Sequence, residues 1–237
     1  MNLSMKRISA LITKEYQDLK TNSQILIMVA LPLVFAFLIS RTAHASTPDS
    51  ATMPILILLT MVTCYTQSLL IAEEKEKHTL RVLMLSPASS VEILTGKAFL
   101  TFIMTLVTCG LCFFILGTEI RNVWLTAGVI LLSSVLFTIF GTIIGLFSEN
   151  VTQTSIYGLP FMFIMMMGPN LKEVISNETL LKIVSYLPSD HLAVGMVKAM
   201  EDGTFADIKM NLFNILIWTI VSGIVCFFVY NKRRFDK

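Results

Sequence analysis

Residues that could carry out catalysis are few, and their positions exclude several classes of reaction. The three histidines, His44, His78 and His191, lie outside the long apolar runs of the sequence. A protease acting on a buried peptide bond would therefore lack its general base or its metal ligands. The pair Gly96-Lys97 lacks the upstream glycine and the following Ser or Thr of a P-loop. We expect no catalytic residue, no metal site and no ATP site in this chain.

A second group of residues is suited to contacts rather than to catalysis. Methionine side chains pack well on irregular and changing surfaces, and uncharged polar groups within apolar helices bind neighbouring helices or substrates. Residues of this kind that could line a substrate path or a seam between subunits are Tyr65, Gln67, Tyr157, Met162, Met165 and Met166. The alternative is that the methionines face lipid and that the polar groups join helices.

The elements that must position these residues are indicated by the distribution of charge. The 237 residues are 54% hydrophobic and only 14% charged, and they contain six uncharged runs of 20 to 27 residues. A helix needs about 20 apolar residues to cross the hydrocarbon of a bilayer. We predict an all-α membrane protein that forms one transmembrane domain over residues 1–237. Its six transmembrane helices should lie at approximately 23–40, 53–73, 98–118, 123–147, 152–169 and 210–230.

Basic residues outside these spans predict the orientation. Six spans place both termini on one side, and that side carries twelve Lys and Arg residues against six on the other. Because basic residues are retained in the cytoplasm, we expect a multi-pass protein of the cell membrane with both termini cytoplasmic. The net charge of only +2 implies no nucleic-acid partner.

Residues before the first span predict a helix parallel to the membrane. Ile8, Leu11, Ile12, Tyr16 and Leu19 share one helical face, so this segment should lie in the cytoplasmic interface. Two roles are open to it: anchoring the first span, or contacting a cytoplasmic partner as well.

The cytoplasmic connection between the second and third predicted spans, residues 73–97, has enough residues for structure of its own. Glu73 and Lys77 are spaced for i,i+4 pairing, which extends the second span into water as a helix. An apolar segment, 79–85, follows and ends at Ser86-Pro87. A Ser-Ser-Val-Glu capping box then begins the helix of the third span. The apolar segment needs cover, either from a partner protein or from lipid headgroups.

The second long connection, residues 170–207, lies on the outer side. Apolar residues recur at i, i+3, i+4 and i+7 from Leu180, and a second stripe begins at Leu192 after Pro188-Ser189-Asp190. Two half-length helices are too short to cross the bilayer. They form either a re-entrant hairpin covered by protein or a helical pair on the surface.

Both connections carry a resemblance to a known family. Glu74-Lys75-Glu76-Lys77-His78-Thr79-Leu80, then Leu83 to Leu85, Ser86-Pro87 and Glu92-Ile93-Leu94-Thr95-Gly96-Lys97 resemble the cytoplasmic loop of type-2 ABC exporter permeases. One departure is His78, which stands where the family usually has glycine. Tyr186-Leu187-Pro188 followed by His191 is similar to the Leu-Pro and nearby His that precede the family's last helix. The number of spans and the long final outer loop also agree.

The resemblance implies a permease subunit that is not an enzyme and binds no cofactor itself. A separate cytoplasmic ABC ATPase would hold ATP and Mg²⁺, and the permease would form a homodimer, or a heterodimer with a second six-span permease, in a bacterial cell membrane. The segment from Thr79 to Ser90 would be the coupling helix, and the outer connection a re-entrant hairpin. The ATPase-coupling residues would be Glu76, Thr79, Leu80, Leu83, Leu85, Ser86, Pro87, Glu92, Gly96 and Lys97. Those of the hairpin would be Leu187, Pro188, Asp190 and His191.

The absence of charge within the spans bears on the energy source and on the substrate. Proton relays and voltage sensors use charged residues inside the membrane, so we expect ATP hydrolysis in the partner to drive transport. An amphipathic or membrane-active substrate is favoured, such as a peptide, an antibiotic or a lipid-like molecule exported from the cytoplasm or the inner leaflet. Two alternatives stay open: a membrane immunity or sensor subunit that captures membrane-active peptides without transport, and sodium export.

Overall fold

The computed structural model describes residues 22–42, 47–77, 90–172 and 177–235, with the backbone alone at 90–94 and 233–235. Within these ranges the chain forms helices and no strands, so the predicted all-α class is confirmed. In chain order the elements are α2 (Ser23–Ile39), η1 (Pro48–Ala51), α3 (Thr52–Ile57), η2 (Leu58–Cys64), α4 (Tyr65–Glu76), α6 (Ser90–Leu116), α7 (Val123–Phe147), α8 (Val151–Leu171), α9 (Glu178–Ser185), α10 (Pro188–Met200) and α11 (Phe205–Phe235).

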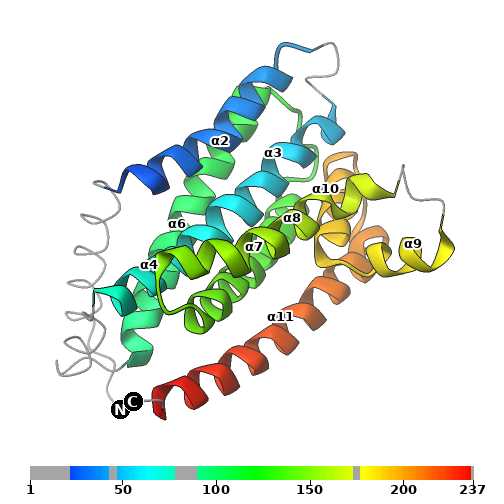
Figure 1. The fold of residues 1–237 in the computed structure, drawn as a ribbon. Helices are drawn as coiled ribbons and strands as arrows, with labels where there is room; N and C mark the ends of the chain where they lie inside the picture. Colours follow the sequence, from blue (N-terminus) through cyan, green and yellow to red (C-terminus); the bar gives the residue numbers. More distant parts are fainter. Residues whose placement is uncertain (1–21, 43–46, 78–89, 173–176, 236–237) are drawn as a thin grey trace.

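The elements from η1 to α4 form one continuous helix of 29 residues, Pro48–Glu76, in the middle of the fold (Figure 1). Its most apolar stretch is 94% buried, and α2, α6, α7 and α8 all pack against it. The segment η2 is a π-helix, in which the Thr63 hydroxyl donates to the Leu58 carbonyl at 3.2 Å. π-Helical turns are rare in proteins, and those that form are frequently found at functional sites. This central helix links the other elements to one another.

Each predicted span corresponds to a helix. Among the described residues, four helices are long and apolar enough to cross a membrane: Pro48–Glu76, Thr95–Leu116, Val123–Phe147 and Phe205–Lys232. The chain is therefore a multi-pass membrane protein by the length and composition of its helices. The helices α2 and α8 coincide with the first and fifth predicted spans. Neither belongs to those four, so six crossings remain a prediction.

Polar contacts place the helix termini at two opposite ends of the bundle. At one end, the end of α4 contacts the start of α2, the first turns of α6, the end of α7 and the start of α8. At the other, Arg121 in the α6–α7 turn donates to Asp202, which precedes α11, at 2.7 Å. Figure 1 shows α11 returning to the end where α4 stops. Successive long helices thus run in alternating directions, as a chain that repeatedly crosses a bilayer would.

The long connection at residues 170–207, predicted to lie on the outer side, contains the two short helices that its apolar stripes predict, α9 and α10. The second helix begins at Pro188 itself, which takes the first helical position because proline has no N–H to leave unpaired there. The predicted interfacial helix, residues 8–19, and the coupling segment 78–89 lie outside the described residues. A position of α9 and α10 within the outer leaflet also remains a prediction.

Candidate functional site

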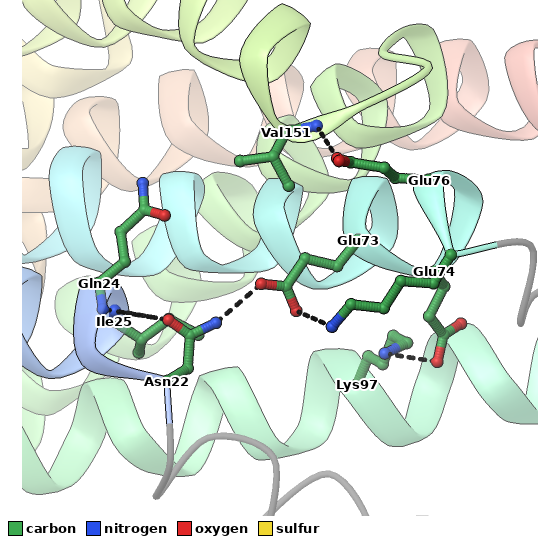
Figure 2. Close-up of polar contacts among 9 residues, drawn as sticks. Asn22, Gln24, Ile25, Glu73, Glu74, Glu76, Lys97 and Val151 are labelled. Carbon is green, nitrogen blue, oxygen red and sulfur yellow. Dashed lines mark hydrogen bonds and ion pairs between the residues drawn. The ribbon is translucent and has the colours of Figure 1, made fainter.

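The last residues of α4 are the most charged stretch of the described chain that adjoins a candidate span. The sequence Glu73-Glu74-Lys75-Glu76-Lys77 follows an apolar helix and continues it, since Glu76 is still helical. The predicted pair of Glu73 and Lys77 is confirmed, with Oε2 and Nζ 4.0 Å apart. Glu74 and Glu76 reach different neighbours, Lys97 of α6 and Val151 of α8 respectively (Figure 2).

Glu74 and Lys97 form a buried ion pair between α4 and α6. The Lys97 Nζ lies 3.0 Å from the Glu74 Oε1, and the two side chains are 2% and 5% exposed (Figure 2). A buried pair of this kind is strongly destabilised when one partner is removed, because the remaining charge stays buried. The pair therefore joins the two helices that flank residues 78–89. Both residues belong to the motif in the sequence, but their mutual contact was not predicted.

Asn22 joins the start of α2 to the same end of α4. Its Oδ1 accepts from the backbone N–H groups of Gln24 and Ile25, at 3.1 and 3.3 Å, and so caps α2. Its Nδ2 donates to the Glu73 Oε1 at 2.8 Å. One amide thus fixes the start of α2 and holds it against α4. Figure 2 shows Asn22 between the two helices.

Lys75 and Glu76 contact the tight turn between α7 and α8. The Lys75 Nζ donates to the carbonyl oxygens of Gly145, Leu146 and Ser148, at 3.2, 2.5 and 2.9 Å. The Glu76 Oε2 accepts from the Val151 backbone N–H at 2.9 Å (Figure 2). Glu76 is one of the predicted coupling residues, and its described contact is with α8.

Two glycines bring α7 against the central helix. A Cβ atom at Gly141 would lie 2.3 Å from the Cys64 carbonyl oxygen, and one at Gly145 would lie 2.8 Å from the Ser68 carbonyl oxygen. Gly141-Thr-Ile-Ile-Gly145 is a Gly-x-x-x-Gly motif, which lets two membrane helices approach backbone to backbone. This motif can be recognised in the sequence alone.

A polar seam crosses the interior where α4, α6 and α7 meet. Gln67 accepts from the Thr101 hydroxyl at 2.8 Å and donates to the Thr142 hydroxyl at 3.2 Å. The hydroxyls of Thr63 and Thr105 are 2.7 Å apart. Gln67, predicted to line a substrate path or a seam, is fully buried within this one chain. Its contacts are those of a residue that joins helices.

The other residues predicted to line a path are divided between core and surface. The Tyr65 hydroxyl lies 2.8 Å from the Ser155 hydroxyl on α8 and accepts from Gln24 on α2 at 3.0 Å. Met162 and Met165 are buried in the core and Met166 is half-buried. Tyr157 is exposed on the outward face of α8. Its exposed apolar neighbours on this helix are Ile156, Leu159, Phe163 and Ile164.

The residues predicted for the outer hairpin lie close together around α10. The Lys172 Nζ is 2.6 Å from the Asp190 Oδ2, which is nearly buried. Leu187 packs so close to Gly168 of α8 that a Cβ there would approach it to 2.7 Å. The His191 carbonyl accepts from Asn211 at 3.2 Å, and burial lowers the pKa of the His191 side chain. The hairpin is thus attached to both α8 and α11.

The structure describes only some of the remaining predicted coupling residues. Thr79, Leu80, Leu83, Leu85, Ser86 and Pro87 lie outside the described residues. Glu92 lies in the first turns of α6, which starts at Ser90 as the capping box predicts, and Gly96 is buried. Within the described ranges, no group of three or more His, Cys, Asp or Glu residues could hold a metal ion. The charged end of α4 thus contacts the start of α2, the first turns of α6, the end of α7 and the start of α8.

Comparisons with known proteins identify one family. The model of a family described as "ABC-2 family transporter protein" matches residues 49–229. No curated protein matches the chain. The matched range extends from the start of the central helix almost to the end of α11 and so includes the α4 junction and the hairpin.

Proposed function

Because the chain belongs to the ABC-2 family of transporter proteins, we propose that it is the permease subunit of an ATP-driven exporter for an amphipathic or membrane-active substrate. The family match over residues 49–229 is the observation that carries this proposal. Members of this family are the membrane component of an ABC transporter. ATP hydrolysis, with its Mg²⁺, therefore belongs to a separate cytoplasmic subunit.

The contact with that ATPase is assigned to residues 79–90, which connect α4 to α6. In support, the two helices that flank this segment are held together by the buried pair of Glu74 and Lys97, 3.0 Å apart. A force applied to the segment therefore reaches both helices at a point where their separation would break a buried ion pair. The apolar residues Leu83 and Leu85 supply the surface that the ATPase would cover.

The outward face of α8 is assigned to the substrate path or to the seam with a second permease. The central helix is almost wholly buried within the chain, whereas α8 exposes Tyr157 among large apolar side chains. An apolar face with a phenolic hydroxyl suits a molecule that has both apolar and polar parts. A second permease, identical or paralogous, would complete the path on this side.

Co-expression of the chain with an ABC ATPase encoded beside it tests the assignment of the contact. We expect the two to co-purify from detergent, and we expect Leu83→Glu and Leu85→Glu to abolish co-purification. Thr47→Glu, an exposed position before the central helix, is the matched control and should leave it unchanged. The assignment would be contradicted if the ATPase were absent from the purified permease and if both glutamate variants kept full transport activity.

A further inference from the structure

Two adjacent residues of α4, with opposite charges, reach the two sides of one turn. Lys75 donates to the carbonyl oxygens of Gly145 and Leu146 in the last turn of α7 and to that of Ser148 just after it, and Glu76 accepts from the first N–H of α8. The turn between them, Ser148-Glu149-Asn150, is only three residues long. We call Lys75 and Glu76, with the backbone groups that they contact, the α7–α8 clamp.

The order of charge in the clamp matches the electrostatics of the two helix ends. The last carbonyls of a helix carry partial negative charge and the first N–H groups carry partial positive charge. The ammonium group of Lys75 has three donors, and each has a carbonyl acceptor here. A carboxylate could accept no bond from those carbonyls, and an ammonium could accept none from the Val151 N–H. Exchange of the two residues would therefore break every contact of the clamp.

Other contacts pack α4, α7 and α8 together as one unit. Gly141 and Gly145 bring α7 to backbone contact with the central helix, and the Tyr65 hydroxyl lies 2.8 Å from Ser155 in the second turn of α8. By contrast, the contact of Lys77 with Glu73 stays within α4 and is largely exposed. The clamp thus attaches α4 to the α7–α8 turn through two charged side chains.

We propose that Lys75 and Glu76 are positioning residues that make the α7–α8 turn follow α4 when the ATPase moves residues 79–90. This rests on the proposed function. The exposed face of α8, which carries Tyr157, then moves together with α4. ATP-driven motion would reach this face through α4 and the clamp, independently of α6.

Hydrogen exchange in the complex of permease and ATPase tests the proposal without knowledge of the substrate. Amide exchange of residues 144–154 would be compared without nucleotide and with ATP plus orthovanadate, in the native chain and in the exchange variant Lys75→Glu/Glu76→Lys. The matched control is Lys77→Glu, which makes the same Lys-to-Glu change at a side chain that is 68% exposed and lies outside the clamp. Lys75→Gln is a milder variant to be used if the exchange variant does not fold.

We expect nucleotide to change exchange at 144–154 in the native complex and in the control. In the clamp variants the nucleotide-dependent difference should be lost, while ATP hydrolysis continues. A purely structural role would raise exchange equally in both states and preserve the difference.

Survival of the full difference in the clamp variants would overturn the proposal, as would a native turn that does not respond to nucleotide. An ATPase that fails to associate with the native chain would instead overturn the proposed function.

Discussion

The buried pair of Glu74 and Lys97 allows the sharpest test of how α4 and α6 are joined. In the native pair the two charged groups are 3.0 Å apart. Glu74→Gln or Lys97→Met removes one of these two charges and leaves the other charge buried. Because the two side chains are only 5% and 2% exposed, water and salt do little to screen the remaining charge. Each single substitution should therefore cost much more than the loss of a surface ion pair.

The magnitude follows from the burial of both partners. Breaking a buried ion pair by removing one partner costs about 3–5 kcal/mol, which in a chain of this size lowers Tm by about 6–20 °C. Replacing both partners by apolar residues of similar size is often neutral or stabilising. The double variant Glu74→Leu/Lys97→Met should therefore be more stable than either single variant.

Thermal unfolding in lipid nanodiscs, followed by intrinsic tryptophan fluorescence, measures these differences. Lys77→Met is the control, because the Lys77 side chain is 68% exposed and its contact with Glu73 is 4.0 Å long; surface pairs contribute about 0–1 kcal/mol. A double variant whose loss equals the sum of the two single losses would show no coupling between the partners and would refute the reasoning.

Three further predictions concern packing and the outer hairpin. Gly141→Ala should destabilise the fold by about 1–3 kcal/mol through overpacking, because its Cβ would lie 2.3 Å from the Cys64 carbonyl oxygen; Gly128→Ala, with nothing within 4 Å, should be neutral or stabilising in the same unfolding assay. Lys172→Gln removes the charge 2.6 Å from the nearly buried Asp190 carboxylate and should lower Tm in the same unfolding assay, whereas Lys172→Arg should retain the native Tm. Burial lowers the pKa of His191 below its ordinary value, although Asp190 opposes this. Since the unfolded side chain then protonates first, stability should be complete above about pH 6.5 and decline as the pH falls below it; His191→Gln should reduce this loss, as measured by Tm at pH 7.5 and 5.5.

Several elements are predictable from local sequence because their ends carry polar residues. The predicted span 123–147 and α7 have the same bounds, since Asn122 caps the helix start and accepts from the Leu125 N–H, and Ser148-Glu149-Asn150 ends the apolar run. The two short outer helices were likewise predicted from their apolar stripes. In each case the signal lies within a few residues of the feature that it predicts.

Contacts between distant helices were not predictable in the same way. A span that is apolar on all sides has no preferred face, so its periodicity does not indicate its neighbours. The fully buried position of Gln67 depends on Thr101 and Thr142 from two other helices. The pairing of Glu74 with Lys97 likewise depends on tertiary packing. The π-helix at Leu58–Cys64 also has no local signal that we could identify.

Uptake into inverted membrane vesicles measures whether the chain acts as the permease of an ATP-driven exporter. Vesicles from cells that express the chain with its ATPase would be given a dye-labelled cationic amphipathic peptide or a short-chain fluorescent phospholipid. We expect at least one probe to accumulate with ATP, and we expect uptake to require both subunits and to be lost in Leu83→Glu. Saturable binding of the peptide to vesicles that contain the permease alone, with no ATP-dependent accumulation of either probe, would contradict this expectation and indicate a capturing subunit instead.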